Sequence, residues 1–364
     1  MAVLWKLEPA TAAKHRLYRR YLDAWWPILL QPSRTGFVRP QVTFMDAFAG
    51  PGEYEGGEEG SPVLVLNRLL THTFVERMML SRRRVRLIFI EKDAARFDHL
   101  RRVLTRRFGP LEDLPVHVDL RRGEAKDAAA VLTEVRAWGH PVLAIFDSWG
   151  NVNVPLTVMA QIARNRSSEV ITTFGPNWFS RRAEENPEAL DMVFGGREYW
   201  QAAEREGRPD ERWRAWLSTY RDALGRAGFA HRLQFQVVPR TGQPLYLVYG
   251  TNHQAGVEAM KDAMWEVDGN DGMSFKDPRT RGAPMIGQMA LGVGPVQDEL
   301  LELVNQRVQQ APVTLGDLGI WLLLETARWR KQDAKRAVRE LVDSGVVTIE
   351  PTGRLTARTR VMPR

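Results

Sequence analysis

The stretch VTFMDAFAGPG, residues 42–52, joins a short apolar run to an acid and a glycine-rich turn. An apolar run of this length is typical of a buried parallel strand, and such sheets bind ligands at the turn that follows. Glycine at Gly50 and Gly52 lets the backbone approach a ligand closely, because no side chain blocks the way. With Gly56 the spacing is Gly-x-Gly-x-x-x-Gly, which differs from the dinucleotide pattern Gly-x-Gly-x-x-Gly. We therefore expect a strand and a ligand-binding turn here, with a tight surface turn as the alternative.

Four more apolar runs follow along the chain, and segments with helical spacing separate them. Strands are expected at 86–93, 116–120, 141–150 and 169–174, and helices at 11–30, 61–81, 94–107, 125–137 and 155–165. Apolar strands that alternate with amphipathic helices predict βαβ units and a parallel sheet covered on both faces.

The pattern changes after residue 175. Residues 176–228 are rich in Trp, Arg and Glu and predict a helical insertion of two or three helices. The runs RLQFQVVPR (232–240) and PLYLVYGTN (244–252) then alternate around Thr241-Gly242, which is typical of a β-hairpin. An antiparallel hairpin after five parallel strands favours the class I methyltransferase sheet over the all-parallel dinucleotide fold. We predict an α/β, Rossmann-like, seven-stranded sheet that ends in this hairpin.

The C-terminal part has a different character. Residues 267–295 contain many Gly, Pro and Asp and are interpreted as a linker or lid. Helices are expected at 295–308, 313–326 and 331–345, followed by two short strands within 346–359. This order predicts a winged helix-turn-helix. The predicted domains are therefore 1–294, which is methyltransferase-like, and 295–364, which is a winged helix.

Composition adds a charge asymmetry. The 364 residues hold 51 Lys or Arg against 44 Asp or Glu, a net charge of +7. Residues 328–364 alone hold ten Lys or Arg and four acids. A concentrated basic end suggests a polyanionic partner such as nucleic acid, with a solvated tail as the alternative.

The same composition excludes several classes of site. There is no cysteine, which excludes disulfides, thiolate metal sites and cysteine nucleophiles. The histidines show no metal-ligand spacing, so no metal is expected. No apolar run approaches the ~20 residues of a membrane helix, and no signal peptide is evident, so we expect a cytoplasmic protein without membrane association. Nothing in the sequence predicts the oligomeric state.

Acidic residues follow the first two expected strands. Asp46 precedes the turn that contains Ala49, and its carboxylate can accept hydrogen bonds from a ligand's ammonium group or ordered waters. Glu91 ends the second strand, where an acid can hold both ribose hydroxyls of an adenosine. Asp93 is the alternative ribose ligand, although it also suits a helix N-cap. The loop EYEGGEEGSP accounts for the long first crossover between these strands.

Two later turns complete the candidate site. Gly123 and Glu124 follow the third strand near the expected adenine position, and Asp119 competes for that role. Asp147 and Trp149, in Asp-Ser-Trp-Gly, follow the fourth strand, where the strand order reverses and ligands bind. Asp147 would face the reacting group, and a base could stack on Trp149, whose alternative role is core packing.

Other side chains remain open as candidates. Trp178 could line the same pocket, His253 could act as a general base or merely cap, and Lys14-His15 could cover a cofactor. In the C-terminal part, Lys331, Lys335 and Arg339 recur every four residues on the expected recognition helix, and Arg354 and Arg358 lie on the wing. These five residues are predicted to contact phosphates, with protein docking as the alternative.

Several segments together resemble the three-Cys-motif partner protein (TcmP) family. The matching segments are KHRLYRRYLDAWWPIL, TFMDAFAGPGEYEGGEEGSPVL, FIEKD, DSWG and YLVYGTNHQAGVEAMKDAMW, and the C-terminal part is similar to the GMT-like winged-helix domain. The resemblance implies a class I methyltransferase that uses S-adenosylmethionine, with Asp46, Gly50, Gly52 and Glu91 at the cofactor. It also implies a separate radical-S-adenosylmethionine protein, with three cysteines, as partner. Where the family commonly has Asp-Pro-Phe-Gly, this chain has Asp147-Ser148-Trp149-Gly150.

The expected function is thus methyl transfer from S-adenosylmethionine to DNA or RNA. The alternative is a catalytically inactive, methyltransferase-like protein that binds nucleic acid or recruits the three-cysteine partner. Nicotinamide-dependent redox chemistry is disfavoured by the closing hairpin and by the glycine spacing.

Overall fold

The computed structural model describes residues 3–183, 185–277 and 295–364. These residues divide into two compact units. Residues up to 253, together with 275–277, form the first unit, and residues 254–274 and 295–364 form the second. Within the described ranges, no helix is long and apolar enough to cross a membrane.

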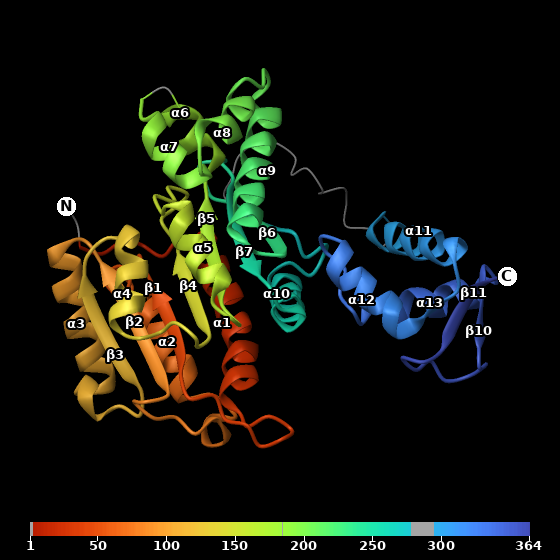
Figure 1. The fold of residues 1–364 in the computed structure, drawn as a ribbon, viewed down its shortest axis with the longest axis horizontal. Helices are drawn as coiled ribbons and strands as arrows, with labels where there is room; N and C mark the ends of the chain where they lie inside the picture. The colour runs from red at the N-terminus through yellow and green to blue at the C-terminus, as the bar shows by residue number, and fades with distance from the viewer. Residues whose placement is uncertain (1–2, 184, 278–294) are drawn as a thin grey trace. The chain divides into compact units, whose positions relative to one another are not determined.

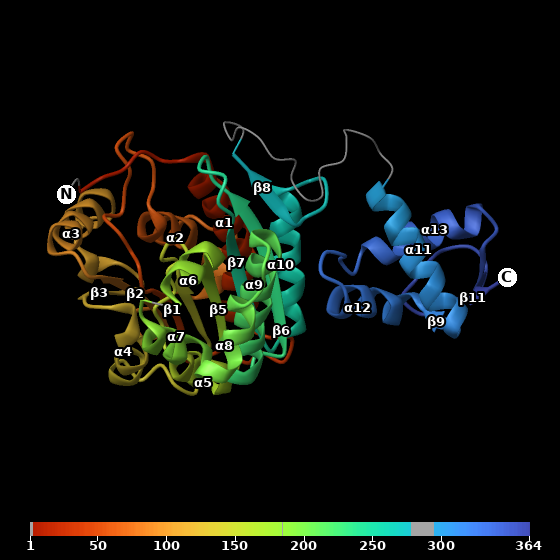
Figure 2. The same cartoon turned by 90° about the horizontal axis from the view of Figure 1, so that it is seen from above.

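The first unit is built on one mixed sheet with the strand order β3-β2-β1-β4-β5-β7-β6-β8. Figure 1 labels β1 to β7, and Figure 2 labels β8. The strands are β1 (Val42–Asp46), β2 (Val85–Glu91), β3 (His117–Arg122), β4 (Val142–Phe146), β5 (Glu169–Phe174), β6 (His231–Val238), β7 (Leu245–Thr251) and β8 (Ser274–Lys276). β1 is fully buried between β2 and β4, as an apolar strand covered on both faces should be.

Strand direction separates this sheet from an all-parallel one. β1 to β5 pair in parallel, whereas β7 pairs antiparallel with both β5 and β6. Antiparallel insertion of β7 between β5 and β6 is the arrangement expected of a class I methyltransferase sheet, so the predicted fold class is confirmed. The predicted number of seven strands is exceeded by one, because the short β8 adds to the edge beside β6.

Helices cover the sheet, and Figure 2 shows them from above. They are α1 (Pro9–Leu30), α2 (Ser61–Leu70), α3 (Ala94–Phe108), α4 (Ala128–Glu134), α5 (Leu156–Arg164), α6 (Pro176–Arg182), α7 (Pro187–Phe194), α8 (Arg197–Glu204) and α9 (Pro209–Ala227). α1 packs against α2, while α5 contacts both α4 and α9. Aromatic side chains of α6 to α9 join the core of β4 and β5; Phe174, for example, stacks on Tyr220 at 4.6 Å.

Three predicted helices differ from the observed ones. The helix expected at 61–81 ends at Leu70, because His72 Nδ1 accepts the Phe74 backbone N–H and turns the chain. The helix expected at 125–137 starts with one 3₁₀ turn and ends at Glu134, before Arg136 with its left-handed φ of 55°. The insertion at 176–228 holds four helices rather than two or three.

In residues 254–274 and 295–364, the second unit contains four helices and a small sheet. Its elements are α10 (Gln254–Val267), α11 (Pro295–Gln310), β9 (Val313–Thr314), α12 (Leu315–Glu325), α13 (Asp333–Asp343), β10 (Val347–Glu350) and β11 (Arg360–Pro363). The strand order is β10-β11-β9, all antiparallel. α11 contacts α13, and α12 contacts both α10 and α13.

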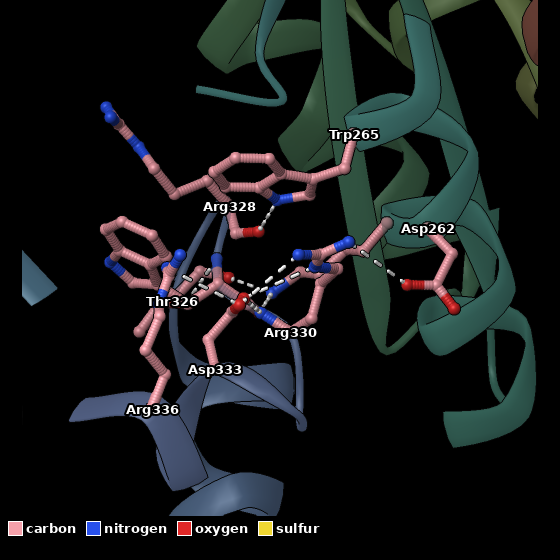
Figure 3. Close-up of polar contacts among 9 residues, drawn as sticks. Asp262, Trp265, Thr326, Arg328, Arg330, Asp333 and Arg336 are labelled. Carbon is pink, nitrogen blue, oxygen red and sulfur yellow. Dashed lines mark hydrogen bonds and ion pairs between the residues drawn. The ribbon is translucent and has the colours of Figure 1, made fainter. Parts of the chain in front are cut away.

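α10 precedes the predicted boundary at residue 295 yet belongs to this second unit. Its Lys261 ammonium donates to the backbone carbonyls of Leu322, Leu323, Thr326 and Trp329 at 2.7–3.3 Å. Figure 3 shows the neighbouring contacts, in which the Trp265 indole donates to the Arg328 carbonyl and Arg330 lies near Asp262. The division therefore differs from the predicted one, because these long-range bonds leave no signal in local sequence patterns.

The predicted linker or lid at 267–295 is only partly described. Ser274–Lys276 forms β8, and the Asp277 backbone N–H donates to the Val238 carbonyl at 2.9 Å. Residues 278–294 of this prediction lie outside the described residues.

Candidate functional site

One pocket of about 1180 Å³ lies at the carboxyl ends of β1, β2, β3 and β4. Eight of the nine residues predicted for the cofactor or for catalysis line it, namely Ala49, Gly50, Gly52, Glu91, Gly123, Glu124, Asp147 and Trp149. Asp46, the ninth, ends β1 next to this wall and is 1% exposed. The parallel sheet therefore brings together turns that lie far apart in the sequence.

Backbone conformation explains the glycines of the first turn. Gly50 and Gly52 have left-handed φ angles of 64° and 88°. A Cβ atom at Gly52 would lie 2.8 Å from Leu100 Cδ1, and one at Gly60 would lie 2.6 Å from the Gly52 carbonyl carbon. The Gly60 N–H also donates to the Gly52 carbonyl at 2.8 Å. The turn is thus packed from behind and forms a pocket wall rather than an open surface turn.

Glu91 reaches this turn from β2. Its carboxylate accepts the Gly50 backbone N–H at 3.0 Å and the Asp93 backbone N–H at 2.7 Å. Asp93 itself caps α3 by accepting the Arg96 N–H at 2.9 Å and is not part of the pocket wall. Of the two acids predicted as alternative ribose ligands, only Glu91 therefore lines the pocket.

Asp46 is buried without an ion-pair partner among the described residues. It accepts the Phe48 backbone N–H at 3.0 Å and the Ser61 hydroxyl at 2.5 Å. Burial raises the pKa of Asp46 to about 6, and the charges of Asp147 and Glu91 act in the same direction. The carboxylates of Asp46 and Glu91, which form no ion pair with a described residue, thus create a negative potential that favours a cationic ligand.

The turn after β3 forms part of the rim. Glu124 is paired with Lys92 at 2.7 Å and with Lys126 at 2.9 Å, and these bonds lower its pKa to about 2. Asp119, the competing candidate, is instead bonded to Arg121 at 2.8 Å and does not line the pocket. Glu124 therefore remains the acid near the predicted adenine position.

Asp147, which was predicted to face the reacting group, is held by hydrogen bonds within the protein. Lys14 Nζ donates to both carboxylate oxygens at 2.7 Å, and the Tyr18 and Thr173 hydroxyls donate at 3.0 Å each. Burial alone would raise the pKa of Asp147, but the Lys14 charge and these hydrogen bonds outweigh it and hold the pKa below its usual range. Asp147 is a bonded anion, poorly suited to act as a proton acceptor.

Trp149 is exposed at the pocket, so its alternative role in the core is wrong. The side chain is 52% exposed, and the Lys14 ammonium lies 4.5 Å from the ring centroid. The backbone at Trp149 has φ 56°, a left-handed conformation that costs a bulky residue about 1–3 kcal/mol. Such strain is most often retained where a side chain must be presented to a ligand.

Of the remaining candidate residues, two line the pocket and two do not. Lys14 and His15 both line the pocket, and burial beside Lys14 lowers the pKa of His15 to about 4, so the ring stays neutral. Trp178 does not line it and packs on Phe179 instead, which corrects that prediction. His253 also lies outside the wall, so it is no general base for this pocket.

Sequence reasoning missed two walls of the pocket. The N-terminal segment contributes Trp5, whose carbonyl accepts the Glu55 N–H at 2.8 Å and whose ring lies under the Arg96 guanidinium at 4.4 Å. The helical insertion contributes α7 through Met192 and Val193. Trp5 and Met192 could not be assigned to the pocket from the sequence, because the residues that they lie beside are distant in the sequence.

The predicted phosphate contacts lie on the second unit. Lys335 and Arg339 are exposed on α13, and Arg354 and Arg358 are exposed between β10 and β11. Lys331 is also exposed but precedes α13, so only two of the three predicted residues lie on that helix. None of the five forms an ion pair with a described residue. No group of three or more His, Cys, Asp or Glu within the described ranges could hold a metal ion.

Comparisons with known proteins found similar folds only. No family model matches the chain, and no curated protein matches it. One similar structure is Trm1 from Pyrococcus horikoshii in complex with S-adenosyl-L-methionine (10% identity, 91% of this chain and 76% of that chain covered, TM-score 0.37). Another is a type I restriction-modification methyltransferase subunit from Streptococcus thermophilus (12% identity, 65% of this chain and 44% of that chain covered, TM-score 0.35). A third is a precorrin-6y C5,15-methyltransferase from Geobacter metallireducens (10% identity, 64% of this chain and 87% of that chain covered, TM-score 0.31). At such TM-scores the fold class rests on this chain's own strand order.

Proposed function

We propose that this protein is an S-adenosylmethionine-dependent methyltransferase that acts on nucleic acid. The observation that carries the proposal is the pocket at the carboxyl ends of β1, β2 and β4, in a sheet with methyltransferase strand order. The Gly50–Gly52 turn, Asp46 and Glu91 all meet there. Ligands of open α/β sheets bind at this edge, where the strand order reverses.

The pocket fits S-adenosylmethionine in charge and size. Asp46 is a buried acid with no cationic partner among the described residues, and Glu91 adds negative charge near it, whereas the charge of Asp147 is balanced by Lys14. The cofactor carries two cationic centres, an ammonium and a sulfonium. The volume of about 1180 Å³ exceeds the roughly 300–1,000 Å³ of a typical single-ligand site, which leaves room for an acceptor.

Each residue then has a defined binding task. Asp46 would hold the ammonium group directly or through water, and Glu91 would accept hydrogen bonds from the ribose hydroxyls while its bond to Gly50 fixes the turn. When bound, S-adenosylmethionine supplies an electrophilic methyl group. The protein's share of catalysis would be alignment and exclusion of water, which together account for much of the barrier reduction in such reactions.

Nucleic acid is the proposed acceptor because of the second unit. Three helices followed by a β-ribbon, α11 to β11, have the order of a winged helix, and α13 would be its recognition helix. The exposed cations Lys335, Arg339, Arg354 and Arg358 would contact phosphates. The resemblance to the three-Cys-motif partner family adds a proposed radical-S-adenosylmethionine partner, and a cytoplasmic setting is also part of the proposal.

A second function has one observation in its favour. Both carboxylate oxygens of Asp147 are bonded to Lys14, so the acid that follows β4 is not available to an acceptor. A methyltransferase-like protein that binds cofactor and nucleic acid without transferring a methyl group would have such a site.

Two measurements separate these functions. Calorimetry with S-adenosylmethionine on the full chain is expected to show one site, and binding should be lost in Gly52→Arg. Labelled-methyl transfer to DNA and RNA fractions then distinguishes the enzyme from the inactive protein. Absence of cofactor binding would eliminate both, whereas binding without transfer supports the second.

A further inference from the structure

A second exposed surface lies at the opposite end of the sheet from the pocket. Residues 31–41 and 71–84 directly precede β1 and β2, and these parallel strands place both segments at the amino end of the sheet. In Figure 1 the loop between α1 and β1 lies below the sheet. The pocket lies at the carboxyl ends, and neither segment contributes to its wall. The exposed side chains of these two segments, together with Ile28 of α1, form what we call the amino-end surface.

Arg84 holds the parts of the amino-end surface together. Its guanidinium donates to the backbone carbonyls of Leu30 at 3.1 Å, Arg39 at 3.0 Å, Met78 at 2.8 Å and Met79 at 2.7 Å. The end of α1, the loop before β1 and the loop before β2 therefore meet at one side chain. Because these bonds fix the backbone in advance, a partner can bind with little loss of conformational entropy.

Four large apolar side chains are exposed on this surface. Ile28, Phe37, Phe74 and Met79 are 42–59% exposed, and they are four of the nine such side chains found among the described residues. His72 holds Phe74 beside α1, because its Nδ1 accepts the Phe74 N–H and its Nε2 lies 3.1 Å from a backbone carbonyl of α1. Met79 also has φ 50°, a left-handed conformation that is uncommon for residues other than glycine. Strain of this kind is most often retained where a residue has a function.

Arginines surround these apolar side chains. Residues 31–41 and 71–84 hold six arginines and a single acid, Glu76, which is a net charge of +5. Arg34, Arg77 and Arg83 are exposed and form no ion pair with a described residue. Two copies of such a surface would repel each other, whereas an acidic partner would be attracted. The charge therefore argues against self-association through this surface and for an acidic occupant.

A protein fits the amino-end surface better than a nucleic acid or a membrane does. Phe, Met and Arg are residue types that are enriched at protein interfaces. The exposed Glu76 would repel the phosphates of a nucleic acid or of an anionic membrane, whereas a protein can place a cation or a polar group against it. A nucleic acid that enters the pocket also has to approach the other end of the sheet.

We propose that the amino-end surface docks an acidic protein segment that also carries large apolar side chains. Those side chains pack on Phe37 and Phe74. Carboxylates of the segment pair with Arg34, Arg77 and Arg83. The inference is independent of the proposed function, because this surface shares no residue with the pocket.

Selection of displayed peptides tests the chemistry of the partner. Random peptides are displayed on phage and selected on the immobilised full chain, after removal of all peptides that bind Phe37→Ala with Phe74→Ala. This step discards peptides for the pocket or the second unit. We expect survivors that contain more Asp and Glu than Lys and Arg, together with large apolar residues. No survivor, or survivors that are neutral or basic, would overturn the proposal.

Melting verifies that the double alanine variant is folded. Both replaced side chains are exposed, so its melting temperature should stay close to that of the wild type. If it is unfolded, Met79→Asn takes its place in the selection, because asparagine tolerates the left-handed backbone at this position.

Arginine variants test the charge pairing with one synthetic survivor, whose binding is followed by fluorescence anisotropy. Arg77→Glu with Arg83→Glu should weaken the peptide by about tenfold or more at low salt, because like charges then face each other. Arg101→Glu with Arg102→Glu on α3 changes the charge equally and should leave the affinity unaltered. Equal affinity in the wild type and in the Arg77 and Arg83 variant would overturn the proposed pairing.

Three further measurements address the other occupants. Single-stranded oligonucleotides, phosphatidylserine vesicles and sedimentation of the chain alone are compared between the wild type and Phe37→Ala with Phe74→Ala. We expect no difference in any of them. Loss of oligonucleotide binding, of vesicle binding or of a dimer in the variant would assign the surface to that occupant and overturn the acidic protein partner. Cofactor binding and methyl transfer should be the same in both proteins, so failure of the proposed function would leave this inference standing.

Discussion

The two halves of the pocket satisfy their polar groups in opposite ways. In the donor half, formed by Asp46, Gly50–Gly52, Glu91 and Glu124, every acid bonds to nearby backbone or surface groups. In the acceptor half, formed by Thr11, Asp147–Asn151 and Met192, the acid bonds to a lysine 133 positions away, and three polar atoms have no partner among the described residues. The donor half is set by local turns, whereas the acceptor half depends on how α1 packs onto the sheet.

The largest expected effect tests the donor half through its backbone. Gly52→Arg should reduce S-adenosylmethionine binding below detection, because even a Cβ would meet Leu100 at 2.8 Å in a left-handed conformation. Gly139→Arg is the matched control, since Gly139 has the same left-handed φ of 88° but nothing within 4 Å of its Cβ. Calorimetry on both variants, with melting to verify folding, separates the effect of the left-handed backbone from the effect of crowding against Leu100 behind the turn.

The next effect tests the acceptor half through its ion pair. Lys14→Met should lower the free energy of unfolding by about 3–5 kcal/mol, because Asp147 would remain as an unpaired, largely buried charge. Adding Asp147→Asn should restore at least half of that loss, since the asparagine is uncharged, and its oxygen can accept from one of the Tyr18 and Thr173 hydroxyls while its NH2 donates to the other. Denaturant unfolding measures both; equal losses in the single and double variants would show that the unpaired Asp147 charge is not what destabilises Lys14→Met.

A smaller effect separates Glu91, which ends β2, from Asp93, which caps α3. Glu91→Ala should weaken cofactor binding by about 10–100-fold, as expected when hydrogen bonds to a charged group are lost. Asp93→Asn should leave the affinity unchanged, because asparagine still caps α3 and this position lies outside the pocket wall. A stronger effect of Asp93→Asn than of Glu91→Ala in the same titration would reverse the assignment.

Protonation of Asp46 gives the donor half a pH dependence. Burial raises the pKa of Asp46 to about 6, so the carboxylate that holds a cation is fully formed only above that pH. Cofactor affinity should be constant above about pH 7 and fall about tenfold per pH unit below 6. His15, whose pKa is about 4, stays neutral over most of this range. Asp46→Asn should bind more weakly, and its affinity should lose this dependence.

The smallest effect concerns the basic residues of the second unit. Lys335→Glu with Arg339→Glu should make the slope of log affinity against log salt concentration less steep, by about the amount that two phosphate contacts contribute. The change should be the same for any nucleic acid sequence. Arg101→Glu with Arg102→Glu, exposed on α3, changes the charge equally and should leave the slope unaltered. If the two double variants have the same slope, Lys335 and Arg339 do not contact the phosphates.

The same contrast explains how far the sequence could predict the structure. The parallel strands, the closing hairpin and the place of Glu91 at a strand end could be predicted, because they follow from apolar periodicity and from the turns that end the strands. The Lys14–Asp147 bond and the wall formed by Trp5 could not, because they join residues that are distant in the chain. The role of Asp147 was inferred from its place after β4, and only the packing of α1 showed that its oxygens are occupied.

Calorimetry of S-adenosylmethionine with the full-length wild type and with Glu91→Ala tests the central claim most directly. The account predicts one binding site per chain in the wild type, weakened about 10–100-fold in Glu91→Ala. Absence of heat in the wild type, or equal affinity in both proteins, would contradict the claim that the turn after β1 and the end of β2 form a cofactor site.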